Sequence, residues 1–122
     1  MKDNFVDLHI EDEILFVIAN SEFYFDLMAA KFITKKRLEM CNGRSYPTFF
    51  DFGESSRYAN LEARNYFTNE GEQNILAAAF IADNVTSRIF IDSYLTIHKP
   101  HILTKVFSAK ESAIKWLKYY AR

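Results

Sequence analysis

The chain has few of the residues on which covalent cross-links and phosphate-binding loops depend. Its 122 residues include one cysteine, three glycines and two prolines. The single cysteine, Cys41, excludes a disulfide within the chain and is typical of a reducing compartment, so we expect a cytoplasmic protein. The glycines Gly43, Gly53 and Gly71 stand alone, so they form neither a P-loop nor a dinucleotide-binding turn.

Histidine is also scarce, and its positions do not favour a metal site. His98 and His101 lie on either side of Pro100, which prevents one helical face from presenting both rings. Cys41 falls on the apolar stripe of a predicted helix, a position that indicates packing rather than nucleophilic catalysis. We therefore expect no bound metal, no cofactor and no catalytic residues.

A strong excess of charge of one sign is missing as well. The formal net charge is −1, which gives no overall field for binding nucleic acid. Residues 1–26 hold seven acidic side chains against one lysine, whereas residues 31–44 and 99–122 are net basic. This asymmetry is explained either by solvated faces or by head-to-tail or swapped contacts between subunits.

The sequence lacks a long apolar run. A membrane-spanning helix needs about 18 or more such residues, and no stretch of the chain approaches that length. The first four residues, Met1-Lys2-Asp3-Asn4, carry charges where a signal peptide would need an apolar core. We therefore expect neither a membrane span nor export by that route.

Aromatic residues are abundant, with twelve phenylalanines and seven tyrosines. Rings of this size need a large core or an interface to cover them. A chain of 122 residues forms one domain that buries roughly two thirds of the surface exposed when it is unfolded. We expect a single globular domain over residues 1–122.

Hydrophobic periodicity predicts five strands and four helices. Residues 5–10 alternate along the chain, and a charged turn separates them from the apolar run 14–19, a pattern typical of a hairpin. The continuous apolar run 75–82 indicates a strand covered on both faces, as in a parallel sheet. The other predicted strands are 46–52 and 102–107, and the predicted helices are 26–42, 60–69, 84–98 and a closing helix from Ser108. The order β-β-α-β-α-β-α-β-α predicts an α/β domain with a mixed five-stranded sheet and packed helices.

The first and last predicted helices have recognisable ends and faces. Asp26 suits the start of the first helix and Gly43 its left-handed exit, and the basic side chains Lys31, Lys35, Lys36 and Arg37 lie mostly off its apolar stripe. Ser108 and Glu111 have the spacing of a capping box, which predicts the start of the last helix. In that helix Trp116 shares a stripe with Ala113, Leu117 and Tyr120, so we expect it to pack in the core.

Several short motifs appear in an order that resembles a known fold. They are Arg37-Leu38-Glu39, Ser45-Tyr46-Pro47, Phe50-Asp51-Phe52, Ala63-Arg64, Lys99-Pro100, Val106-Phe107-Ser108 and the ending Phe107 to Leu117. Together with the element order they resemble the SpoIIAA-like fold of bacterial STAS domains, which are anti-sigma-factor antagonists. More narrowly, they resemble small STAS/SpoIIAA-like proteins of Bacteroidetes-type bacteria. The resemblance covers most of the chain and implies a regulatory, protein-binding role.

The phosphorylation switch of those antagonists is not expected here. In that family a strand ending in aspartate, matched by Asp51, is followed by a phosphorylated serine at the start of the next helix. Counted along the family pattern, this serine falls at Asn60 or Leu61, and neither residue can accept a phosphate. Ser55 and Ser56 lie upstream and have the character of turn residues, so we predict no regulatory phosphoserine.

Two groups of residues are candidates for a functional surface. Asp51, with Ser55, Ser56 and Arg64, lies at the end of a strand where α/β sheets usually bind ligands, and the group could bind a ligand or a partner. The alternative is a structural salt bridge between Asp51 and Arg64 that anchors the loop.

The second group lies on the helix 84–98, which carries more apolar side chains than one buried stripe requires. The surplus centres on Phe90, Ile91 and Tyr94 and indicates a subunit interface or a groove for an apolar ligand. The alternative is burial of these side chains under a neighbouring helix of the same chain.

Three functional hypotheses follow from these features. The first is a non-catalytic STAS-like regulatory module that binds a protein partner or self-associates. The second is a carrier of an apolar small molecule or lipid, because SpoIIAA-like folds resemble the Sec14-type lipid-binding folds. The third, an enzyme that uses Asp51, Ser55 and Arg64, is not favoured, because no general base or activated nucleophile is evident.

Overall fold

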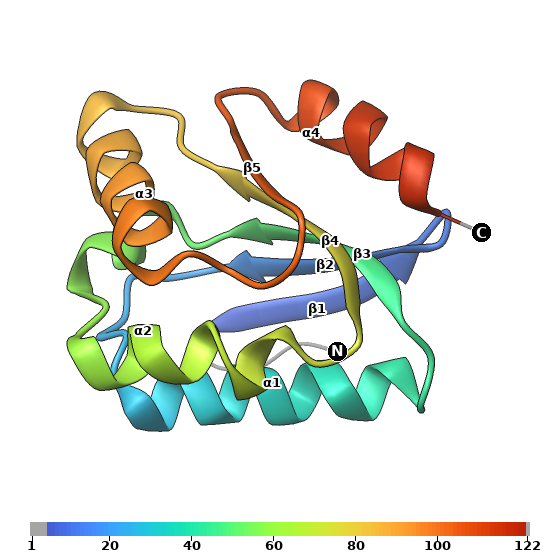
Figure 1. Ribbon diagram of the computed structural model, residues 1–122, viewed down its shortest axis with the longest axis horizontal. Helices are drawn as coiled ribbons and strands as arrows, with labels where there is room; N and C mark the ends of the chain where they lie inside the picture. The colour runs from blue at the N-terminus through green and yellow to red at the C-terminus, as the bar shows by residue number, and fades with distance from the viewer. Residues whose placement is uncertain (1–4, 122) are drawn as a thin grey trace.

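A computed structural model describes residues 5–121 and contains one five-stranded sheet (Figure 1). The strands are β1 (Val6–Glu11), β2 (Ile14–Ala19), β3 (Tyr46–Asp51), β4 (Ile75–Ile81) and β5 (Thr104–Phe107). They lie side by side in chain order, β1 antiparallel to β2 and the others parallel. The α/β class, the mixed five-stranded sheet and the order of elements are therefore confirmed.

Helices cover both faces of the sheet. The α-helices are α1 (Leu27–Cys41), α2 (Leu61–Phe67), α3 (Val85–His98) and α4 (Lys110–Leu117), and the short 3-10 segments are η1 (Gly53–Tyr58), η2 (Glu70–Glu72) and η3 (Lys118–Tyr120). Right-handed crossovers that all step in the same direction place their helices on one face. Accordingly, α1, α2 and α3 share one face of the sheet and α4 packs on the other (Figure 1). None of the helices in residues 5–121 is long and apolar enough to cross a membrane.

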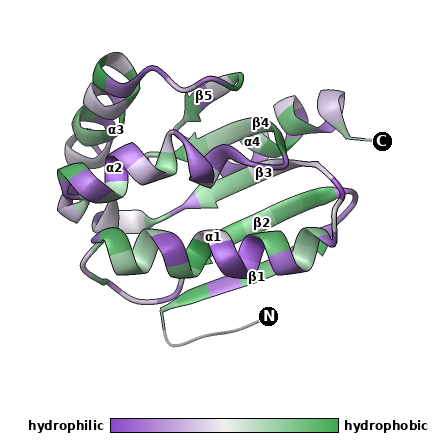
Figure 2. Ribbon diagram, turned by 60° about the horizontal axis from the view of Figure 1, so that its bottom comes forward, coloured by the Kyte–Doolittle hydropathy of each residue, from purple (hydrophilic) through white to green (hydrophobic). Residues whose placement is uncertain are grey.

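Alternation along the strands divides the core into two layers. On β3, Phe50 packs in the layer under α1, α2 and α3, whereas Phe49 packs in the layer under α4 with Ala113 and Leu117. Every residue of strand β4 except the half-buried Leu76 is buried, and Ala79 is fully inaccessible, so the predicted burial on both faces is confirmed. Figure 2 shows β2, β3 and β4 as mostly hydrophobic and α1 as a mixture of hydrophobic and hydrophilic residues.

Three helices begin at side chains that cap them as their residue types predict. The side-chain oxygen of Asp26 accepts from Ala29 N at 2.9 Å, and that of Asn60 accepts from Ala63 N at 2.9 Å. Asn84 caps α3 in the same way. These contacts fix the direction in which each helix leaves its loop.

The predicted capping box at Ser108 and Glu111 is wrong. Helix α4 begins at Lys110, its N-cap residue is Ala109, and no side chain caps it. The chain uses both Ser108 and Ala109 to turn out of β5, so Ser108 lies one residue too early to cap the helix. The packing of the last helix is as predicted for its inner stripe: Ala113 and Leu117 are fully buried, and the half-buried Trp116 lies between other aromatic rings.

Arg37 is the main exception to the predicted faces of α1. Its side chain is fully buried, and its Nη2 donates to the carbonyl of Gly71 at 3.0 Å. Burial lowers the pKa of the guanidinium, opposed by the neighbouring Cys41 thiol. Arg37 therefore joins α1 to η2 from inside the protein instead of facing solvent.

Candidate functional site

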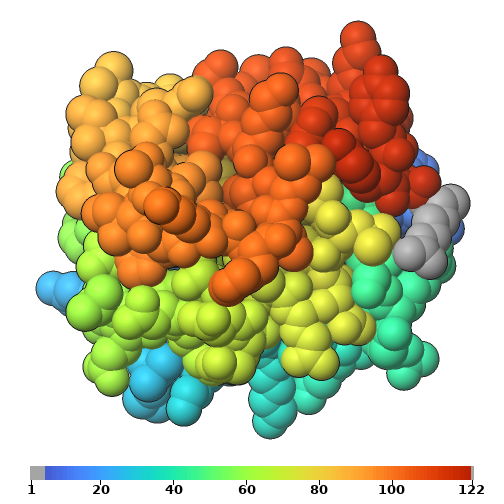
Figure 3. Space-filling view, in the orientation of Figure 1, coloured from blue at the N-terminus to red at the C-terminus, as the bar shows by residue number. Residues whose placement is uncertain are grey.

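A cavity of about 200 Å³ lies on the face covered by α1, α2 and α3, between α2, α3 and η1. We call it the α2–α3 pocket. Its apolar wall consists of Phe25, Phe52, Ala59, Ala63, Phe67, Phe80 and Ile91, and its remaining lining residues are Ser56, Arg57, Arg64, Phe90 and Tyr94. Figure 3 shows α3 and α2 meeting along one side of the molecule.

Aromatic rings from several elements form the floor of this pocket. Phe52 directly follows β3 and continues its alternation, so its ring lies on the same side of the sheet as Phe50, 5.5 Å away between centroids. Phe25 and Phe67 meet the Phe52 ring edge-on at 4.9 Å and 5.8 Å. Edge-to-face pairs of this kind are favourable beyond the area that they bury. The floor is therefore rigid and sits at the carboxyl ends of β3 and β4, where open α/β sheets bind ligands.

The two arginines of the pocket differ in how well they are paired. Arg57 is 3.6 Å from Glu54 and 3.9 Å from Glu22, and its Nη2 donates to the Tyr58 hydroxyl at 2.9 Å. Arg64 forms no ion pair with any carboxylate in residues 5–121, and its Nε is buried without a hydrogen-bond partner. Arg64 is therefore the cation of the pocket that is not neutralised.

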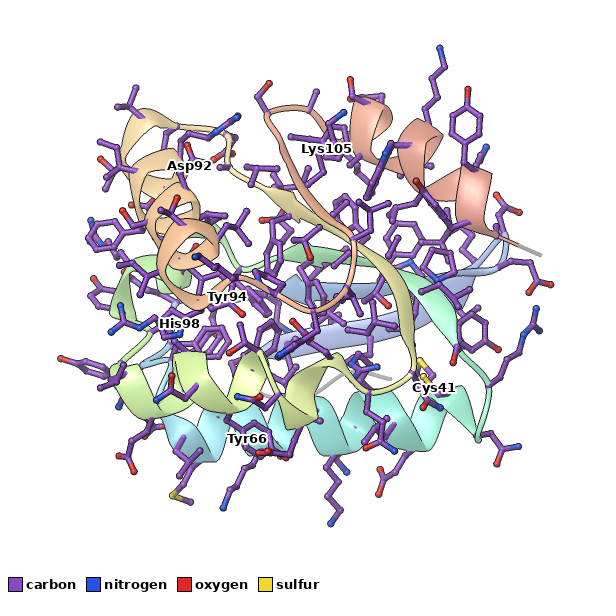
Figure 4. All side chains as sticks on the ribbon, viewed as in Figure 1. Cys41, Tyr66, Asp92, Tyr94, His98 and Lys105 are labelled. Carbon is purple, nitrogen blue, oxygen red and sulfur yellow. The ribbon has the colours of Figure 1, made fainter. Side chains whose placement is uncertain are left out.

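Tyr94 and His98 lie at the end of α3 that approaches α2 (Figure 4). Their rings are 5.4 Å apart between centroids. Burial raises the pKa of Tyr94 above its usual range, and the charge of Glu72 adds to the effect. Burial, and then the positive charge of Arg64, lowers the pKa of His98, whose Nε2 is buried without a hydrogen-bond partner. Both side chains are therefore held in their neutral forms near neutral pH.

Asp51 and Arg64 do not form the salt bridge that was considered from the sequence. Asp51 alternates with Phe50 and Phe52, so it lies on the α4 side of the sheet and away from the pocket. Its carboxylate accepts from Gly53 N at 3.1 Å, and burial together with the charge of Asp83 raises its pKa.

The two serines belong to the turn after β3. Ser55 is fully buried, and its Oγ accepts from Phe23 N at 3.0 Å. Ser56 is half-buried at the pocket, and its Oγ donates to the carbonyl of Gly53 at 2.8 Å. Both serines lie in the 3-10 segment η1, and Ser56 and Arg64 are the members of the first candidate group that line the pocket.

The second candidate group lies at the same pocket. Ile91 is 5% exposed, Tyr94 is half-buried, and Phe90, at 45% exposed, borders the opening. Ile91 and Tyr94 therefore pack within the chain. Besides Phe90, the apolar side chains of α3 that face solvent are Val85, Ile89 and Ile97.

The sequence did not single out Phe52, Phe67 and Arg57, which line the pocket, or His98, which packs against Tyr94. The position of His98 could have been predicted, because Ile91, Tyr94 and His98 follow one another at the three- and four-residue spacing of a single helical face. No periodic pattern in the sequence marks Arg57, because it lies in the short segment η1 and not on a long helix or strand. In the described part of the chain, no three His, Cys, Asp or Glu side chains lie together as metal ligands would.

Comparisons with known proteins place the chain in a family without assigning it a role. The search of curated proteins gave no match, and the search of solved structures gave none either. A family model described as a domain of unknown function, DUF7793, matches residues 8–121. The match covers nearly the whole chain, and the protein therefore belongs to the DUF7793 family.

Proposed function

We propose that this domain is a non-catalytic binding module that takes a small apolar molecule into the α2–α3 pocket. The observation that carries the proposal is a cavity of about 200 Å³ with a floor of phenylalanine rings and a few polar groups at its opening. Concave, mostly apolar sites with a small number of placed polar groups are typical of ligand pockets. The order of elements supports the STAS-like fold expected from the sequence, in which such a module would have a regulatory role.

The volume of the pocket limits the size of its ligand. An apolar cavity of about 150 Å³ is enough to hold a benzene molecule. The 200 Å³ of the α2–α3 pocket therefore suits one aromatic ring or a short alkyl chain with a small head group. A long-chain lipid is too large, so the carrier hypothesis narrows to small molecules.

The chemistry of the lining favours binding over catalysis. Its polar side chains are Ser56, Arg57, Arg64 and Tyr94. The hydroxyl of Ser56 donates to a backbone carbonyl, and the raised pKa of Tyr94 makes that phenol a poor general base. A nucleophile needs a base within hydrogen-bond reach, and the lining supplies no such pair.

Calorimetric titration with phenylacetamide, a neutral molecule with one ring, tests this function. We expect saturable binding to the wild-type protein with a dissociation constant in the millimolar range or tighter. Two variants that fill the pocket, Ala63→Leu and Ala59→Phe, should each weaken binding at least tenfold. Ala109→Phe, which adds the same ring at an exposed position near α4, should bind as the wild type does. Equal binding by all four proteins would refute the proposal.

A second candidate function, binding of a protein partner, is favoured by the outer face of α3. Val85, Ile89 and Ile97 are 76%, 59% and 68% exposed, and clustered exposed apolar residues mark interaction surfaces. Phe90, Ile91 and Tyr94 of the same helix line the pocket, so a ligand could alter what this surface binds. The double variant Ile89→Ser/Ile97→Ser should reduce self-association measured by analytical ultracentrifugation. A wild-type protein that is monomeric at high concentration would exclude self-association through α3.

A further inference from the structure

Two polar atoms where α2 meets α3 are buried and have no hydrogen-bond partner. They are Nε of Arg64 and Nε2 of His98. Arg64 lines the α2–α3 pocket, and His98 packs against Tyr94, which lines it too. Buried polar groups are nearly always satisfied in proteins, so Arg64 stands out as a pocket-lining guanidinium that the described chain leaves poorly paired.

The other arginine of the pocket, Arg57, has partners for its guanidinium within the chain. Arg57 contacts the carboxylates of Glu54 and Glu22 and the hydroxyl of Tyr58. Arg64 has no counterpart to these carboxylates within residues 5–121. The pocket therefore has one positive charge that the described chain leaves unbalanced.

We infer that the ligand of the α2–α3 pocket is a small carboxylate whose head group binds Arg64 and whose ring or short alkyl body lies on the phenylalanine floor. This inference rests on the proposed function and names the class of its ligand. A guanidinium and a carboxylate match in geometry and form charge-assisted hydrogen bonds. The carboxylate would supply Arg64 with the negative partner that the described chain does not.

The charge balance favours a carboxylate over a phosphate ester. One unpaired guanidinium supplies one positive charge, which a carboxylate monoanion neutralises. A phosphate dianion would bring a second negative charge next to apolar walls, where an uncompensated charge is strongly unfavourable. The volume of the pocket also limits the ligand to about the size of one ring with a one-carbon arm and a carboxylate.

The test compares phenylacetate with phenylacetamide, its neutral isostere, by calorimetric titration. Wild-type protein should bind phenylacetate at least tenfold more tightly than phenylacetamide. Arg64→Gln should remove most of this preference, so that the two compounds bind the variant within about twofold of each other. Arg57→Gln, the matched control for a paired arginine at the same pocket, should keep the preference.

A second measurement needs no variant and holds even if Arg64→Gln does not fold. In ¹H–¹⁵N spectra of the wild-type protein, the Nε–H signal of Arg64 should shift more at saturating phenylacetate than at saturating phenylacetamide. An unshifted Arg64 signal at saturating phenylacetate would overturn the inference.

The outcomes separate this inference from the proposed function. If phenylacetamide binds and phenylacetate binds no more tightly, the carboxylate assignment is wrong and the binding function stands. If neither compound binds the wild-type protein, both proposals fail. If benzylphosphonate binds more tightly than phenylacetate at pH 8, the assignment to a carboxylate is likewise overturned.

Discussion

Truncation of Phe67 to alanine should destabilise the protein strongly, because this ring belongs to both the core and the pocket. Phe67 is 7% exposed, and its centroid lies 5.3 Å from Phe50, 5.7 Å from Phe25 and 5.8 Å from Phe52. Buried Phe→Ala substitutions cost about 3–5 kcal/mol in the free energy of unfolding. One side of the ring faces the pocket, where water can enter the enlarged space, so we expect about 3 kcal/mol.

A loss of this size is large for a domain whose total stability is on the order of 5–15 kcal/mol. It corresponds to a fall in melting temperature of roughly 10–15 °C. Urea unfolding followed by circular dichroism measures it, with the slope of the transition unchanged if both proteins unfold in two states. The control is Tyr119→Ala, an aromatic residue that is 80% exposed and should change stability by less than about 0.5 kcal/mol. A loss below about 1 kcal/mol for Phe67→Ala would mean that the ring is not packed as described.

Three further predictions concern helix caps, the buried serine and pH. Asn60→Ala should cost about 1 kcal/mol of stability because it removes the cap of α2, whereas Ser108→Ala should have almost no effect, and equal losses in urea unfolding would contradict this. Ser55→Ala should cost about 1–3 kcal/mol because it leaves the amide of Phe23 unpaired, and a neutral effect would mean that this contact is absent. The folded state binds fewer protons than the unfolded state below about pH 6.5, because the pKa of His98 is lowered, so stability should fall as the pH falls through that range. His98→Asn should flatten this dependence, and an unchanged slope would contradict the assignment.

The sequence was sufficient for the order and type of the elements because each strand and helix carries its own periodic pattern. The run 75–82 lacks alternation since β4 is buried on both faces, and the residues Asp26, Asn60 and Asn84 mark the helix starts. The capping box failed because the Ser-x-x-Glu spacing says nothing about how many residues the chain needs to turn out of the preceding strand.

The site was predictable only in part. Phe90, Ile91 and Tyr94 were identified by their apolar surplus, yet the sequence did not say that Ile91 and Tyr94 line a pocket shared with Arg64. That requires knowing that α2 and α3 lie on the same face, which depends on the direction of the crossovers. Asp51 does not line this pocket, because alternation along β3 turns it to the α4 side of the sheet.

Intermolecular nuclear Overhauser effects between phenylacetamide and the wild-type protein test the central claim most directly. The ring protons of the ligand should show contacts to the methyl groups of Ala63 and Ile91, which line the α2–α3 pocket. They should show none to the methyl group of Ala113, which is buried on the other face of the sheet. Contacts to Ala113, or none to Ala63 and Ile91 at saturating ligand, would contradict the account.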